Sequence, residues 1–171
     1  MKRASTHALY ALAIAVFTAV AGNGQAAHFT DPNSDYIFDV PEAKWKMTVK
    51  PSATSPNVEY VYGDRNDGHF EVRKIAVARD AQLSEVIRAE EQKLQFLPGF
   101  VAGKTESFRG RMAGNIFNFE FVRAGRPMSG RFYFLRADDT TVYVLRFTGF
   151  TDKLRSIQHE TDSIGRTFQV K

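Results

Sequence analysis

The 171-residue sequence contains no cysteine. Disulfide bonds, thiolate metal sites, cysteine nucleophiles and lipid attachment through a cysteine are therefore excluded. A Gly-x-Ser-x-Gly elbow and a His-x-x-x-His pair are also missing, which argues against a serine hydrolase and against a zinc site. Without disulfides, stability must come from a packed core. The fifteen Phe, six Tyr and one Trp can build one, because each large aromatic side chain buries roughly 150–250 Å².

Long apolar runs are also scarce, and the one that stands out lies at the N-terminus. A Lys-Arg pair precedes an uncharged stretch at 8–22, which is shorter than the ~20 residues of a spanning helix but suits a signal peptide. Small residues then stand at the positions that a signal peptidase reads for cleavage after Ala26, with Ala27 as the neighbouring option. We predict a signal peptide over 1–26, a single domain over 27–171, and a periplasmic or secreted location. An uncleaved anchor is the alternative, and the polar residues directly after the run argue against it.

Excess charge of one sign is small once the predicted signal peptide is set aside. The whole chain carries a net charge of +4, and removing the Lys-Arg pair leaves +2, which gives no case for a nucleic-acid partner. The charge is unevenly spread. Residues 27–103 carry nine Lys and Arg against twelve Asp and Glu, whereas 104–171 carry twelve against seven. We therefore expect a polarised surface.

Alternating apolar and polar residues indicate strands along most of the chain, and two segments have helical periodicity. Strands are predicted at 36–40, 45–50, 58–62, 69–77, 104–109, 117–121, 130–135 and 141–147. Helices are predicted at 83–97, ended by a Pro-Gly pair, and at 151–165, ended by a glycine. The last two strand runs are apolar on both faces, so they should lie centrally in the sheet under helices. The predicted fold class is α+β, an antiparallel sheet with helices packed on its faces.

Four finer expectations concern turns and burial. The segment 28–34 contains Asp-Pro-Asn and is predicted to be a turn-forming string without a regular element. The strict alternation over 45–50 predicts a strand with one buried face. The Asp-Gly pair at 67–68 is predicted to turn a hairpin, and the chain should turn again at 125–127.

The order of elements and two short motifs resemble those of the PsbP-like superfamily. An early Tyr/Phe strand leads into Pro41-x-x-x-Trp45, and the terminal helix ends in Ile164-x-x-Thr-Phe. The superfamily includes the extrinsic oxygen-evolving protein of photosystem II, a nuclear Ran-binding factor and bacterial periplasmic proteins. The resemblance runs from about Asp35 to Lys171 and implies a single-domain α/β/α sandwich that docks onto other proteins instead of catalysing a reaction. Photosystem members help to retain calcium and chloride, but no motif in this chain carries such an ion site over.

The residues offer little to catalysis or metal binding, and we predict no enzyme, no cofactor and no metal. The histidines at 28, 69 and 159 lie in a tail, at a strand start and on a helix, so no catalytic triad is indicated. The run from Asp64 to Gly68 is superficially similar to a calcium loop. An EF-hand counted from Asp64 needs glycine sixth and glutamate twelfth, and the sequence has His69 and Ile75 there. We interpret the run as a hairpin turn.

Arginines in the C-terminal half are the candidate partner-binding residues. Arg123, Arg126 and Arg131 surround one predicted hairpin, where they would meet an acidic partner or anionic lipid headgroups. The alternative is a solvated face whose arginine stems cover the Phe-rich strands. We predict an exported, non-enzymatic accessory protein that docks onto a protein of the cell envelope, with an anionic membrane surface as a further partner. Other interpretations are a periplasmic carrier that holds a small apolar ligand in an aromatic-lined pocket and an enzyme of unknown class.

Overall fold

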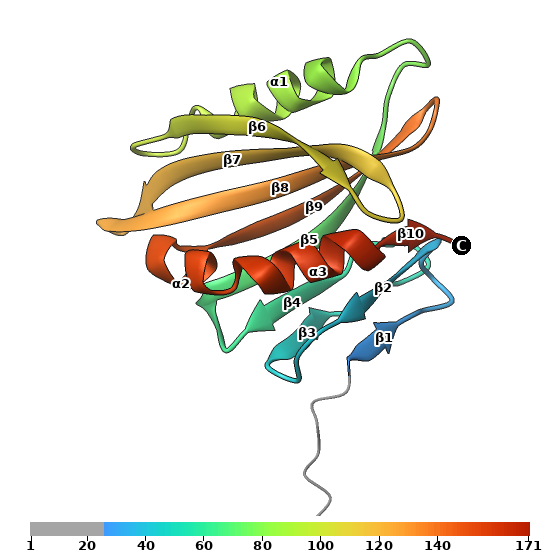
Figure 1. Ribbon diagram of the computed structural model, residues 1–171, viewed down its shortest axis with the longest axis horizontal. Coiled ribbons are helices and arrows are strands. Elements are labelled where there is room, and N and C mark those ends of the chain that lie inside the picture. The colour runs from blue at the N-terminus through green and yellow to red at the C-terminus, as the bar shows by residue number, and fades with distance from the viewer. Residues whose placement is uncertain (1–25) are drawn as a thin grey trace, which may run out of the picture.

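The computed structural model describes residues 26–171, which form ten strands and three helices (Figure 1). The strands are β1 (Ala27–Phe29), β2 (Tyr36–Val40), β3 (Trp45–Val49), β4 (Glu59–Tyr62), β5 (Asp64–Ala76), β6 (Val101–Arg109), β7 (Ala113–Arg123), β8 (Arg126–Asp138), β9 (Thr141–Phe150) and β10 (Gln169–Val170). The helices are α1 (Leu83–Leu94), α2 (Thr151–Ser156) and α3 (Gln158–Thr167).

Seven strands form one antiparallel sheet in the order β3-β4-β5-β9-β8-β7-β6. A second, three-stranded sheet has the order β1-β2-β10. Helix α1 covers one face of the large sheet, while α2, α3 and the small sheet lie on the other (Figure 1). The predicted α+β class and the three-layered arrangement are confirmed, and β8 and β9 lie near the middle of the sheet, as their two apolar faces indicate.

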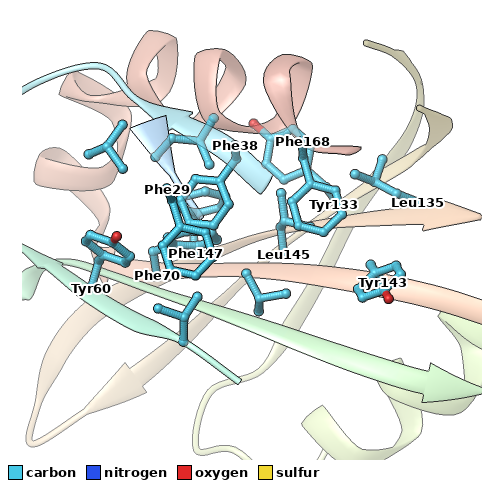
Figure 2. Close-up of a cluster of buried hydrophobic side chains, with 14 of the residues drawn as sticks. Phe29, Phe38, Tyr60, Phe70, Tyr133, Leu135, Tyr143, Leu145, Phe147 and Phe168 are labelled. Carbon is cyan, nitrogen blue, oxygen red and sulfur yellow. The ribbon is translucent and has the colours of Figure 1, made fainter. Parts of the chain in front are cut away.

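An aromatic core fills the space between the large sheet and the layer of α3 and the small sheet (Figure 2). Phe70 on β5 and Phe147 on β9 stack with ring centroids 4.4 Å apart. Phe38 of β2 meets Phe70 edge-on at 5.4 Å, and Phe168, directly after α3, stacks on Tyr36 of β2. Because rings from both sheets and from the C-terminal segment interlock, this core fixes the position of α3 on the large sheet.

A second core lies under α1. Val86 and Ile87 of this helix pack against the phenylalanines of β7 and β8. Glu90, buried on the same helix face, forms ion pairs with Arg146 on β9 and with Lys93 on the next turn of α1. The helix is therefore held on the sheet by apolar packing and by one buried ion pair.

Two expectations about the first strands are wrong. The segment 28–34 is not free of regular structure, because β1 pairs with β2 and the ring of Phe29 is buried among the rings of β2. Strand β3 forms as predicted, but only Trp45 is buried, and Met47 and Val49 are both 42% exposed. The strand lies at the edge of the large sheet, so it has a neighbouring strand on one side only.

One predicted turn and the predicted C-terminal helix also differ from the structure. The chain reverses at Gly63, whose φ of +67° favours glycine, and the Asp-Gly pair at 67–68 lies inside β5. The predicted helix at 151–165 is two helices separated at Ile157. Gly165 does not end α3 but lies inside it, where the missing side chain leaves room for the rings of Phe108 and Tyr133.

The predicted signal peptide and its anchor alternative fall on 1–25, outside the described residues. Within the described part of the chain, no helix is both long enough and apolar enough to cross a membrane.

Candidate functional site

The β7–β8 hairpin presents two of the three predicted arginines. Its turn residues are Ala124 and Gly125, with φ of +49° and +74°, one residue earlier than the predicted turn. Positive φ at both central residues is the geometry that matches the twist of a two-residue hairpin. It places Arg123 and Arg126 opposite each other on adjacent strand ends, and both are exposed.

The two arginines lie over aromatic rings and have no acidic partner. The guanidinium carbon of Arg126 lies 3.6 Å from the ring centre of Phe150, and that of Arg123 lies 5.5 Å from the ring centre of Phe121. Neither side chain forms a salt bridge with any residue in 26–171. Stacking on a ring limits the motion of each guanidinium while leaving its N–H groups free to bind.

An exposed phenylalanine lies beside this hairpin. Phe96, in the loop between α1 and β6, is 90% exposed. The loop is tied to β7 because the Val122 N–H donates to the Pro98 carbonyl at 2.7 Å and Gly99 packs against the Val122 side chain. We call the three exposed residues Phe96, Arg123 and Arg126 the hairpin-end surface.

Arg131, the third predicted residue, lies elsewhere. It is only 8% exposed and sits five residues along β8 from Arg126. Its Nε donates to the Tyr133 hydroxyl at 2.8 Å, and its terminal nitrogens donate to Asn118 Oδ1 at 2.9 Å and Asp162 Oδ1 at 2.8 Å. Burial alone would lower the pKa of Arg131, but Tyr133 and Asp162 raise it above its ordinary value. The guanidinium is therefore charged and held in one orientation.

Arg131 forms part of the wall of a groove of about 260 Å³ between the outer strands β6–β8 and helices α2 and α3. We call it the sheet-end groove. Its lining residues are Val101, Ala102, Gly103, Asn118, Phe119, Glu120, Ser129, Gly130, Arg131, Thr151, Leu154, Arg155 and Gln158. The groove lies between helix and sheet, where an apolar carrier would hold its ligand. Only one aromatic residue, Phe119, lines it, and most of the other rings lie in the two cores.

The strand register orders the groove floor into rows. Val101, Glu120 and Ser129 are aligned on neighbouring strands in one row, and Asn118 and Arg131 form the next. The Ser129 hydroxyl donates to Thr151 Oγ1 at 2.9 Å, which closes the floor against α2. Polar side chains from two strands and from the helix wall therefore line a candidate binding site.

Catalytic groups do not converge on this groove. His28, His69 and His159 each contact a carboxylate outside it, at distances of 2.7, 2.9 and 3.1 Å. Within residues 26–171, no three His, Asp or Glu side chains are arranged to hold a metal ion. The arrangement is suited to binding.

No protein-family model and no curated protein sequence matches the chain. Solved structures do. The Ran-binding protein Mog1p of Saccharomyces cerevisiae has a TM-score of 0.61 at 10% identity, with 85% of this chain and 95% of that chain covered. The cyanobacterial PsbP of Synechocystis has a TM-score of 0.57 at 13% identity, with 89% and 96% covered. The protein has the PsbP-like fold. LpqN of Mycobacterium tuberculosis, described as involved in cell envelope biogenesis, has a TM-score of 0.56 at 16% identity, with 86% and 92% covered.

The predicted resemblance to PsbP-like proteins is thus confirmed for the fold. The structure brings Arg123 and Arg126 together and separates Arg131 from them. Two residues that sequence reasoning passed over are Phe96 and Arg155. Phe96 was recognisable in principle, since it falls off the apolar stripe of the preceding helix and a large apolar side chain there has no core to enter.

Proposed function

We propose that this PsbP-like protein is an exported, non-enzymatic accessory protein that docks onto a protein of the cell envelope through the hairpin-end surface. The observation that carries the proposal is the exposed Phe96 beside two arginines that have no acidic partner among the described residues. Phe and Arg are enriched at the centres of protein interfaces, where a ring fills a pocket and a guanidinium binds carboxylates or carbonyls.

The energetic cost of ordering supports this surface over other exposed arginines. A free arginine loses roughly 2 kcal/mol of rotamer entropy when it is fixed. Arg126 is already stacked 3.6 Å above the Phe150 ring, and the loop of Phe96 is anchored to Val122. A partner therefore meets side chains whose freedom is already reduced, which favours binding.

The fold comparisons support the general class of function. Mog1p is named as a Ran-binding protein, and LpqN is placed in cell envelope biogenesis. Since identity to each is 16% or less, the comparisons lend support through the shared fold only. The partner and the exported location remain parts of the proposal.

The test compares two charge-reversed variants in the native host. Phe96→Ala/Arg123→Glu/Arg126→Glu changes the hairpin-end surface, and Arg109→Glu/Arg111→Glu changes two exposed arginines at the opposite end of the sheet. After cross-linking in intact cells and purification, the first variant should lose its specific partners by about tenfold or more, whereas the second should retain them.

Equal recovery of partners by the two variants would contradict the assignment. A membrane surface is the other outcome of the test. If the wild type cross-links to no protein but sediments with vesicles that contain phosphatidylglycerol, and the triple variant does not, then the proposed protein partner is wrong.

A further inference from the structure

The sheet-end groove contains a buried cation that still has hydrogen-bonding capacity. A guanidinium has five N–H donors. Arg131 uses three of these donors, to Tyr133, Asn118 and Asp162. Each terminal nitrogen keeps one further N–H, and no acceptor among residues 26–171 pairs with either of them. The side chain is 10% exposed, and Arg131 is one of the residues that line the groove.

The surroundings of Arg131 fix it for recognition. Asn118, which accepts from Arg131, in turn donates to the Lys104 carbonyl and to Glu106 Oε1, both at 3.4 Å. Asp162 accepts from Arg131 and from the Tyr133 hydroxyl, and it does not line the groove. A ligand would therefore meet a pre-oriented guanidinium whose acidic partner lies outside the groove, which lowers the entropic cost of binding.

The charges that line the groove favour an anion. Two guanidinium groups, of Arg131 and Arg155, line it together with one carboxylate, of Glu120. Arg155 forms no salt bridge with any residue in 26–171. Glu120 lies in the row next to that of Arg131, so it would repel an anion from its own end and leave the Arg131 end as the favourable position. Two guanidinium forks are suited to a planar carboxylate.

The shape of the groove favours a side chain on an extended segment. One side of the groove is formed by residues 101–103 of β6, the edge strand of the large sheet, and residues 101–107 are all exposed. Val101, which is 60% exposed, and Leu154 give the groove apolar walls beside its charges. A segment that crosses this exposed edge can insert one side chain into the groove while its flanking residues contact the apolar walls.

We propose that the sheet-end groove receives the carboxylate of an Asp or Glu in an extended segment of the docking partner, and that this segment crosses the β6 edge and enters the groove past Val101. The carboxylate accepts hydrogen bonds from Arg131 and Arg155, and the flanking apolar residues of the segment contact Val101 and Leu154. This inference rests on the proposed docking function and names the chemistry of the partner.

The test uses a capped peptide, acetyl-Gly-Val-Asp-Val-Gly-amide, titrated into the 15N-labelled protein and observed by NMR. The Nε–H signal of Arg131 should be visible because the group is buried and bonded to Tyr133. That signal and the amide of Ser129 should shift with a Kd on the order of 1 mM, and the matched Asn peptide should bind about tenfold more weakly. Absence of these shifts, or equal shifts with the Asn peptide, would overturn the proposal.

Two matched variants test the position of the segment. Val101→Glu places a negative charge in the lining of the groove. The control, Val49→Glu, places the same charge far from the groove, on β3 at the other edge of the sheet. Both valines are exposed, so both variants should fold. We expect Val101→Glu to weaken binding of the Asp peptide about tenfold and Val49→Glu to leave its affinity unchanged. Equal effects would contradict the proposal.

The source of the carboxylate is tested with sodium acetate at the peptide concentration. If acetate shifts Arg131 as strongly as the peptide does, then the groove takes free carboxylates and the extended segment is wrong. The peptide result is independent of the cross-linking experiment. If the peptide does not bind but the hairpin-end variant loses its partners, only the groove proposal is wrong. If the peptide binds but the hairpin-end variant keeps its partners, only the docking surface is wrong.

Discussion

Replacing Phe70 with alanine should cause a large loss of stability. Phe70 is completely buried at the centre of the aromatic core. Its ring contacts four others, those of Phe38, Trp45, Tyr60 and Phe147, at centroid distances of 5.4, 6.3, 6.1 and 4.4 Å. The substitution would remove all four contacts and leave a cavity where strands of both sheets meet.

The magnitude follows from these contacts. A buried Phe replaced by Ala costs about 3–5 kcal/mol, and aromatic pairs add about 0.5–1.5 kcal/mol each beyond their buried area. With four ring partners, we expect a loss no smaller than the middle of this range, about 4 kcal/mol of unfolding free energy. For a urea dependence of about 2 kcal/mol/M, the unfolding midpoint should fall by about 2 M.

The assay is urea unfolding followed by the fluorescence of Trp45, the single tryptophan of the sequence, which is 5% exposed and adjoins Phe70. Phe96→Ala is the matched control, because the same substitution at a 90% exposed position should change stability by less than about 0.5 kcal/mol. A loss below about 1.5 kcal/mol for Phe70→Ala, or equal losses for the two variants, would refute the reasoning.

Two further predictions concern a buried carboxyl and two glycines. Burial and the neighbouring Glu42 carboxyl raise the pKa of Glu160. The neutral acid therefore stabilises the fold below the unfolded-state pKa of about 4.3, and this contribution is lost as pH rises through the raised value. In thermal unfolding, the stability of Glu160→Gln relative to the wild type should therefore increase from about pH 4 to pH 8. A stability difference that does not change with pH would contradict this. Gly130→Ala should cost about 1–3 kcal/mol, because its Cβ would lie 2.1 Å from the Phe119 ring. Gly125→Ala meets only open space and should cost about 1 kcal/mol through its positive φ, so a larger loss at Gly125 in urea unfolding would contradict the packing argument.

The layers of the fold could be predicted because local patterns agree with the tertiary environment. Runs at 130–135 and 141–147 are apolar on both faces, and they lie in β8 and β9, which are covered on both sides. The stripe through Val86, Ile87 and Glu90 marks the buried face of α1. Where burial depends on what lies above a strand, the alternation alone was misleading, as at Met47, which fits the regular pattern but is 42% exposed.

The candidate site was less predictable, because it depends on contacts between distant residues. Alternation places Arg131 on the face opposite to the Phe-rich core of β7 and β8, but it cannot show that α3 covers that face. Asp162, which pairs with Arg131, follows 31 residues later in the sequence. The groove likewise forms from three strands and two helices, and no local sequence motif indicates that these elements lie together.

The small sheet has a consequence for the timing of folding. Strand β2 is bordered by β1 on one edge and by β10 on the other, so Ile37 pairs with Gln169 from the opposite end of the domain. Contacts of such long sequence separation form slowly, since the whole intervening chain must be ordered or closed into a loop first. Strand β2 cannot complete its pairing until the last strand has emerged, whether from a ribosome or from a translocation channel. If the chain is exported, as we propose, its small sheet would be completed only after the final residues have crossed the membrane.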